Sequence, residues 1–160
     1  MIFATDLHRI NIDNIKYCNN TINTVINGVF TKINYTTNVC VLNGLYILFP
    51  IESLINQSNK IEFNPFTEYN EQFIKTLSGI ENNILNKYIK NNNLDIKKKN
   101  ILNSQLYTGF MKIYKDVNRT GNITIHNDIN KNLILKISGI WDTGYTCGIT
   151  YKLYECSHTI

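Results

Sequence analysis

Hydrophobic and polar residues alternate along the first part of the chain, a pattern typical of β-strands that bury one face. β-Branched and aromatic residues fill 29–36 (VFTKINYT) and 39–49 (VCVLNGLYILF), and a shorter run follows at 60–63 (KIEF). Residues 36–38 (TTN) suit a tight turn, and Pro50 ends the second run. We therefore predict three strands, the first two joined as a hairpin.

The hydrophobic period then changes to three and four residues, the spacing of an amphipathic helix. The apolar residues at this spacing are Phe73, Leu77, Ile80, Ile84 and Tyr88. Thr67, followed by Glu68 and Glu71, supplies an N-terminal cap and an acidic first turn. This pattern predicts one helix over about 66–90, ending before the Asn-rich segment 91–93.

Strand-like segments return after a lysine-rich loop. They are 106–115 (LYTGFMKIYK), 122–126 (NITIH), 132–141 (NLILKISGIW) and 146–155 (TCGITYKLYE). Residues 142–145, which include Gly144, have the composition of a turn between the last two strands. We predict a closing β-hairpin at 132–155.

The predicted order is strands, one long helix, then strands, without an internal repeat or a linker. With 160 residues, 43% of them hydrophobic, the chain is long enough for one domain with its own core, 1–160. The fold class is mainly β with one long helix (α+β). A helix between strands 3 and 4 is the order of an OB-fold-like barrel. A generic α+β sandwich fits the pattern nearly as well.

Composition and charge add a mild preference for polyanionic partners. The net charge is +4, and lysine supplies most of the positive charge. The run Lys97-Lys98-Lys99 has the composition of a solvated loop. The N-terminus MIFATDLHRI meets Asp6 before a signal-peptide core forms, and no apolar run is long enough to span a membrane. Four cysteines without a C-x-x-C pair favour free thiols in a reducing compartment.

The sequence contains one tripeptide typical of a catalytic class. Asp142-Thr143-Gly144 matches the D-T-G signature of aspartic proteases, but too few residues follow to complete a protease lobe. We interpret Asp142 as a turn residue. The three histidines lie outside known catalytic motifs, and Cys147, Cys156 and His158 lack the short spacing of structural zinc sites. We therefore expect no enzyme activity, no metal and no cofactor.

Aromatic and lysine residues alternate on several predicted strands, so that both types project from one face. These candidates for nucleic-acid contact are Phe30, Lys32, Phe110, Lys112, Tyr114, Lys136, Lys152 and Tyr154, with Trp141 and Tyr145 flanking the last turn. Proteins that bind single strands combine rings for base stacking with cations for phosphates. The alternative is that the rings fill the core, Trp141 above all, and the lysines are ordinary strand surface.

Four blocks of the sequence carry a family resemblance. They are 30–51 (FTKINYTTNVCVLNGLYILFPI), 62–65 (EFNP), 77–85 (LSGIENNIL) and 135–152 (LKISGIWDTGYTCGITYK). These blocks resemble phage-type single-stranded DNA-binding proteins of giant viruses, the nucleo-cytoplasmic large DNA viruses. An A/T-rich source, indicated by abundant Asn, Ile and Lys, agrees with such an origin.

The resemblance implies an OB-fold and a non-catalytic role in viral DNA replication, recombination or repair. It also implies a location in the host cytoplasm, the viral factory or the virion. The phage-type proteins end in an acidic tail, whereas this sequence ends in ECSHTI.

Two other functions stay open at this point. A viral structural or scaffold protein would self-assemble or pack with the genome, so its partner would be a second copy or another viral protein. An enzyme with an unrecognised site is the third hypothesis. Stacking and phosphate contacts do not distinguish DNA from RNA.

Overall fold

The computed structural model describes residues 4–52, 54–57, 59–114 and 132–156. The strands are β1 (Ile15–Ile22), β2 (Val29–Thr36), β3 (Val41–Leu42), β4 (Leu45–Leu48), β5 (Ile55–Gln57), β6 (Lys60–Glu62), β7 (Lys97–Lys98), β8 (Phe110–Tyr114), β9 (Asn132–Asp142) and β10 (Thr146–Cys156). The α-helices are α1 (Glu68–Asn91) and α2 (Ile101–Tyr107), and two short 3₁₀ turns, η1 (Leu7–Arg9) and η2 (Ile12–Asn14), precede β1.

The β9–β10 hairpin is the centre of the sheet, whose main path is β1-β2-β9-β10-β8-β6-β5. Two strands pair with the edge of β9 that faces away from β10. β4 pairs with 134–137, and β2 pairs with 139–142. The edge of β10 that faces away from β9 likewise pairs with two strands, β7 and β8, and both run parallel to β10. Each central strand therefore joins segments that lie far apart in the sequence.

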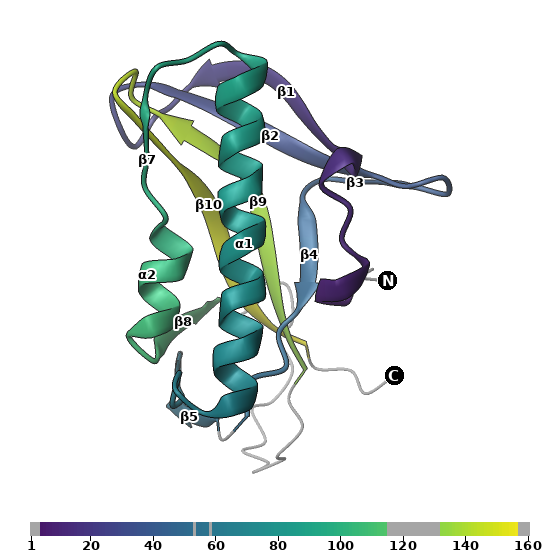
Figure 1. Cartoon of the computed structure of the whole chain (residues 1–160), viewed down its shortest axis with the longest axis vertical. Helices are drawn as coiled ribbons and strands as arrows, with labels where there is room; N and C mark the ends of the chain where they lie inside the picture. The colour runs from purple at the N-terminus through teal and green to yellow at the C-terminus, as the bar shows by residue number, and fades with distance from the viewer. Residues whose placement is uncertain (1–3, 53, 58, 115–131, 157–160) are drawn as a thin grey trace, which may run out of the picture.

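One face of this sheet, called the inner face here, is covered by α1, with α2 beside it (Figure 1). The helix begins as expected, because the Thr67 side chain accepts a hydrogen bond from the backbone N–H of Asn70 and Glu68 and Glu71 follow in the first turn. Ile74, Leu77, Ile84 and Leu85 on α1 are fully buried, as are Ile33, Leu45, Ile47, Leu135, Ile137 and Ile140 on the sheet. The core thus lies between the helix and the inner face.

A buried polar contact ties the β9–β10 turn to the helix. The Asp142 carboxylate accepts a hydrogen bond from the Tyr88 hydroxyl at 3.0 Å and another from the Gly144 backbone N–H at 2.6 Å. Gly144 has φ +84, a left-handed conformation that glycine adopts without strain. Asp142 is the last residue of β9, so the turn itself is 143–145, and the Asp142 side chain closes this turn through Gly144.

Several predicted elements are confirmed with small changes in their ends. These are β2, β6, α1, β9 and β10. The predicted segment 122–126 lies outside the described residues. The described strands form an open path from β1 to β5, so the expected barrel, and with it the OB-fold, remains a prediction. No helix in the described part of the chain is long and apolar enough to cross a membrane.

Two predicted strands are wrong in part. Segment 39–49 is divided into β3 and β4 at Gly44, whose φ is +133. The chain turns there because β3 pairs with β2, whereas β4 pairs with β9. Segment 106–115 begins in the last turn of α2, and Gly109, with φ +72, separates this helix from β8.

Candidate nucleic-acid interface

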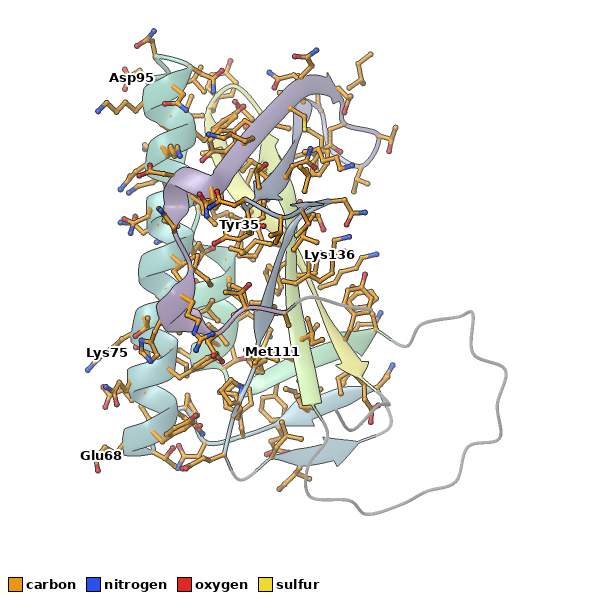
Figure 2. All side chains as sticks on the ribbon, turned by 90° about the vertical axis from the view of Figure 1, so that its right-hand side faces the viewer. Tyr35, Glu68, Lys75, Asp95, Met111 and Lys136 are labelled. Carbon is orange, nitrogen blue, oxygen red and sulfur yellow. The ribbon has the colours of Figure 1, made fainter. Side chains whose placement is uncertain are left out.

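The face of the sheet opposite α1, called the outer face here, carries the predicted side chains. On β8, Met111 and Ile113 are buried toward the helix, whereas Phe110, Lys112 and Tyr114 are exposed on the other side. Figure 2 shows Lys136 on β9 pointing away from α1, with Met111 between the sheet and the helix. The period-two alternation read from the sequence therefore describes the two faces correctly.

Tyr114 is the centre of a group of rings and ammonium groups at one end of the outer face. The Nζ atoms of Lys112 and Lys152 lie 5.1 and 5.0 Å from the centre of its ring. The ring of Tyr154, from the neighbouring strand β10, lies 6.4 Å away. Cation–π contacts of this length hold the lysine side chains on the ring faces.

A second contact of the same kind continues this group across the sheet. Lys136 Nζ lies 5.0 Å from the Tyr46 ring centre and 3.4 Å from Asn43 Oδ1. Asn43 Oδ1 also accepts a hydrogen bond from the Tyr46 hydroxyl at 2.7 Å. The set Tyr46, Lys112, Tyr114, Lys136, Lys152 and Tyr154 is called the tyrosine–lysine cluster below.

Lysines are also placed directly opposite one another across neighbouring strands. Lys136 on β9 is the register partner of Lys152 on β10, and Lys112 on β8 is the partner of Lys60 on β6. Like charges at directly opposite positions destabilise a sheet. The arrangement concentrates positive charge on the same surface as the rings.

At the other end of the outer face, two rings lie against glycines. Phe30 and Trp141 are register partners on β2 and β9, and both are half-buried. A Cβ atom added to Gly139 would lie 2.5 Å from Phe30 Cζ, and one added to Gly148 would lie 2.5 Å from Trp141 Cζ2. The rings thus rest on bare backbone. Phe30, Trp141, Gly139 and Gly148 are called the ring platform below.

The lysine run after α1 adds cations beside the ring platform. Lys98 faces the helix, because its Nζ donates to Asn82 Oδ1 at 2.6 Å and to Asn86 Oδ1 at 2.7 Å. Neighbouring residues of an extended chain point to opposite sides, so Lys97 and Lys99 lie toward the outer face. All three lysines are exposed, as a solvated segment requires, but Lys97 and Lys98 form β7 along β10 and are not a loop.

Tyr145 lies at the tip of the β9–β10 turn and is 83% exposed. Its backbone carbonyl accepts a hydrogen bond from the Lys97 N–H at 2.9 Å, so the turn and β7 lie side by side. Lys32, the register partner of Gly139, lies exposed on the opposite side of the ring platform.

Several carboxylates lie on the helix side of the molecule, whereas Glu62, the register partner of Phe110, lies on the outer face. Glu68, Glu71 and Asp95 lie along or just after α1, and Asp13 lies 3.5 Å from Lys87 of the same helix. In Figure 2, Glu68 and Asp95 lie on the side opposite Lys136. These carboxylates are accompanied by Lys75, Lys87 and Lys90 of α1, whereas lysines outnumber carboxylates among the named residues of the outer face.

The outer face holds nine of the ten predicted residues, namely Phe30, Lys32, Phe110, Lys112, Tyr114, Lys136, Trp141, Lys152 and Tyr154, and the tenth, Tyr145, lies at its edge. The expectation that Trp141 could anchor the core is wrong, because its ring lies over Gly148 on the outer face. Sequence reasoning missed Tyr46, Lys60, Lys97, Lys99, Gly139 and Gly148. Strand alternation could have indicated Tyr46 and Lys60, but the two glycines carry no pattern.

The buried titratable groups serve the core. Burial, with a smaller contribution from Asp142, raises the pKa of the Cys147 thiol to about 11, so the thiol stays protonated and unreactive. Burial likewise raises the pKa of Tyr151 to about 12. Within the described residues, no group of three or more His, Cys, Asp or Glu side chains could hold a metal ion. His158 and the Cys156 side chain lie outside the described part.

Comparisons with protein-family models, with curated proteins and with solved structures found no match to this chain.

Proposed function

We propose that the protein binds single-stranded DNA through the outer face, without catalysis. The resemblance of the sequence to phage-type single-stranded DNA-binding proteins of giant viruses suggests the context, which is viral DNA replication, recombination or repair in the host cytoplasm or the viral factory. An OB-like relationship of the fold belongs to the same proposal. The rings on the outer face supply stacking surfaces, and the lysines supply contacts for phosphates.

The observation that carries the proposal is the pairing of lysines across strands. Lys136 opposes Lys152, and Lys60 opposes Lys112, beside exposed tyrosine rings. Repulsion between such partners lowers the stability of the sheet, whereas a bound chain of phosphates would remove the repulsion. A polyanion is therefore the ligand that best fits this surface.

Aromatic rings on the same face as the lysines favour a single strand over a duplex. A base stacks on a protein ring only when its own faces are free, and each such contact is worth about 1–3 kcal/mol. The same chemistry suits RNA, and the choice of DNA rests on the sequence resemblance.

A second candidate function is a viral structural or scaffold protein. It is favoured by aliphatic side chains exposed at the ends of hairpins, namely Ile22 at 86%, Val25 at 89% and Val39 at 91%. Such side chains suit a contact with a second copy of the chain or with another viral protein.

The experiment that tests the proposal is fluorescence anisotropy of a labelled oligo-dT of about 30 nucleotides, compared with duplex of equal length at two salt concentrations. We expect single strands to bind more tightly and affinity to fall steeply with salt, because phosphate contacts release counterions. K152Q should weaken binding and flatten the salt dependence by about 0.7 per lost contact. K75Q on the exposed side of α1 is the matched control and should bind like the wild type.

Absence of binding at low salt would reject the proposal. Self-association that persists at high salt would then favour the structural candidate, because an apolar interface is not weakened by salt.

A further inference from the structure

The aromatic rings at the two ends of the outer face have different neighbours. In the tyrosine–lysine cluster, ammonium groups already lie about the rings, at 5.0 Å from Tyr114 and from Tyr46. On the ring platform, the backbone of Gly139 and Gly148 lies beneath Phe30 and Trp141 instead. Both residues are half-buried, so part of each side chain stays accessible to solvent.

The glycines are what allow the rings to lie on the sheet. At Gly148, the two atoms nearest to an added Cβ would be Trp141 Cζ2 at 2.5 Å and Cε2 at 2.8 Å. At Gly139 they would be Phe30 Cζ and the Thr31 carbonyl oxygen, both at 2.5 Å, with Phe30 Cε2 next at 2.9 Å. Separations this short are strongly repulsive. Another residue at Gly148 would lift the Trp141 ring off the backbone, and one at Gly139 would displace both the Phe30 ring and the neighbouring strand β2.

The two rings are spaced for separate bases. Phe30 covers Gly139 on β9, and Trp141 covers Gly148 on β10, so the covered positions differ by one strand and two residues. With about 4.8 Å between strands and about 3.4 Å per residue, the rings are roughly 8 Å apart. Successive nucleotides of duplex DNA rise by only about 3.4 Å. A duplex cannot place neighbouring bases on both rings, whereas a flexible single strand can splay them.

We infer that the ring platform is a stacking subsite for two unpaired bases, with Gly139 and Gly148 as its positioning residues. Lys32 on one side and Lys97 and Lys99 on the other side contact the adjoining phosphates. The tyrosine–lysine cluster, about 14 Å further along β10 by strand geometry, binds the backbone of the same strand. This inference rests on the proposed function and states where bases, as distinct from phosphates, are recognised.

The first test uses the native protein, because Trp141 is its only tryptophan. Titration with oligo-dT should quench the tryptophan fluorescence to saturation, since a base stacked on the indole provides a path for quenching. An abasic oligonucleotide of the same length keeps the phosphates and lacks the bases. It should bind roughly fivefold or more weakly and leave the fluorescence unchanged.

The second test compares G148A with G79A. G148A should lift the Trp141 ring, weaken oligo-dT binding roughly fivefold or more, and keep the salt slope of the wild type. Its affinity for the abasic oligonucleotide should equal that of the wild type. Gly79 lies on α1 with nothing within 4 Å of an added Cβ, so G79A should bind normally.

G148A also brings its Cβ to 3.0 Å from the Lys99 carbonyl oxygen, so its thermal transition must be checked. F30L provides a second variant, which adds no atom against the backbone and should show the same loss for oligo-dT alone. Equal affinity for oligo-dT and the abasic strand, or unquenched Trp141 in a saturated complex, would overturn the subsite and leave the proposed function standing. Absence of binding to either strand would reject both.

Discussion

Neighbouring residues of the sheet have opposite surroundings. Lys152 is exposed on the outer face, whereas Leu153, the next residue, is 1% exposed on the inner face. Outer-face substitutions should therefore alter binding, and inner-face substitutions should alter stability. Surface changes away from buried contacts usually shift the free energy of unfolding by less than about 0.5 kcal/mol.

Tyr114 and Met111 on β8 form a matched pair for this distinction. Y114A removes the ring on which the Lys112 and Lys152 ammonium groups lie, and should weaken the binding of oligo-dT and of the abasic strand by the same factor, roughly fivefold or more, because the phosphate contacts lose their positioned cations. M111A leaves a cavity under α2 and should lower the free energy of unfolding by about 2–5 kcal/mol. Urea denaturation and anisotropy on both variants measure the two effects. Loss of the cooperative transition in Y114A would contradict the assignment of the outer face.

Tyr88 is the residue through which α1 holds the β9–β10 turn. In Y88F the Asp142 carboxylate loses a hydroxyl donor that lies 3.0 Å away, and Asp142 is only 6% exposed. We expect the free energy of unfolding to fall by about 1–3 kcal/mol, measured in urea. The control is Y145F, whose hydroxyl belongs to a side chain 83% exposed, and which should unfold like the wild type. Equal stability of the two variants would show that the buried hydrogen bond contributes little.

At the scale of elements, hydrophobic alternation and periodicity predicted those segments in which buried and exposed side chains follow a regular pattern. α1 and the β9–β10 hairpin bury one stripe or one face, and both were recognised. β1 was missed because its second half, Asn19-Asn20-Thr21, is polar and exposed and so lacks a buried face. α2 was missed because seven residues are too few to display a helical period clearly.

The sequence predicted which face of the sheet each site residue occupies, but it did not predict which residues of other strands lie beside it. Parity along each strand put Lys112 with Tyr114 and Lys152 with Tyr154, and this grouping is observed. No sequence pattern indicates that β4 and β2 share one edge of β9, so the contact of Tyr46 with Lys136 could not be foreseen. The ring platform could not be predicted from the sequence either, because the contact of the Trp141 ring with Gly148 depends on the register between β9 and β10.

Glu81 joins the two helices and makes stability depend on pH. Its fully buried carboxylate accepts hydrogen bonds from the backbone N–H groups of Leu102 at 3.0 Å and Asn103 at 2.9 Å, at the start of α2. Burial raises the pKa of Glu81 above its ordinary value of 4.5, although these N–H groups oppose the shift. The folded state therefore holds the proton more tightly than the unfolded state does.

The stability that this proton contributes is fully present below about pH 4.5 and is lost as pH rises through the folded pKa. We expect the difference in unfolding free energy between the wild type and E81Q to decrease as pH rises across this window. Urea denaturation at several pH values measures it, with E71Q in the exposed first turn of α1 as the control. A difference that grows with pH would show that the ionised form is the one favoured by the fold.

At the scale of the whole molecule, the described lysines and carboxylates are partly segregated. The outer face carries Lys32, Lys112 and Lys152, whereas Glu68, Glu71 and Asp95 lie on the helix side. A polyanion would be drawn more strongly to the outer face than to the helix side, where Lys75, Lys87 and Lys90 accompany the carboxylates, and this difference orients the molecule during encounter.

Chemical acetylation of lysines, followed by mass spectrometry, tests this orientation. Bound oligo-dT should protect Lys32, Lys112 and Lys152 and leave Lys75 and Lys90 on α1 as reactive as in the free protein. The two helix lysines are internal controls, since they are exposed and belong to the same molecule. Uniform protection of all five residues would indicate coating by a non-specific electrostatic layer.

The position of the central hairpin late in the chain has a consequence for synthesis of the protein. β4 ends at Leu48, and the strand that pairs with it begins its contact at Ile134. At a translation rate of about 5–20 residues per second, β4 waits roughly 4–17 s for that partner. During this interval β4 has no partner along the edge that β9 will occupy. The nascent chain therefore completes its sheet only after β9 and β10 emerge, and until then the apolar residues of β4 are a target for chaperones.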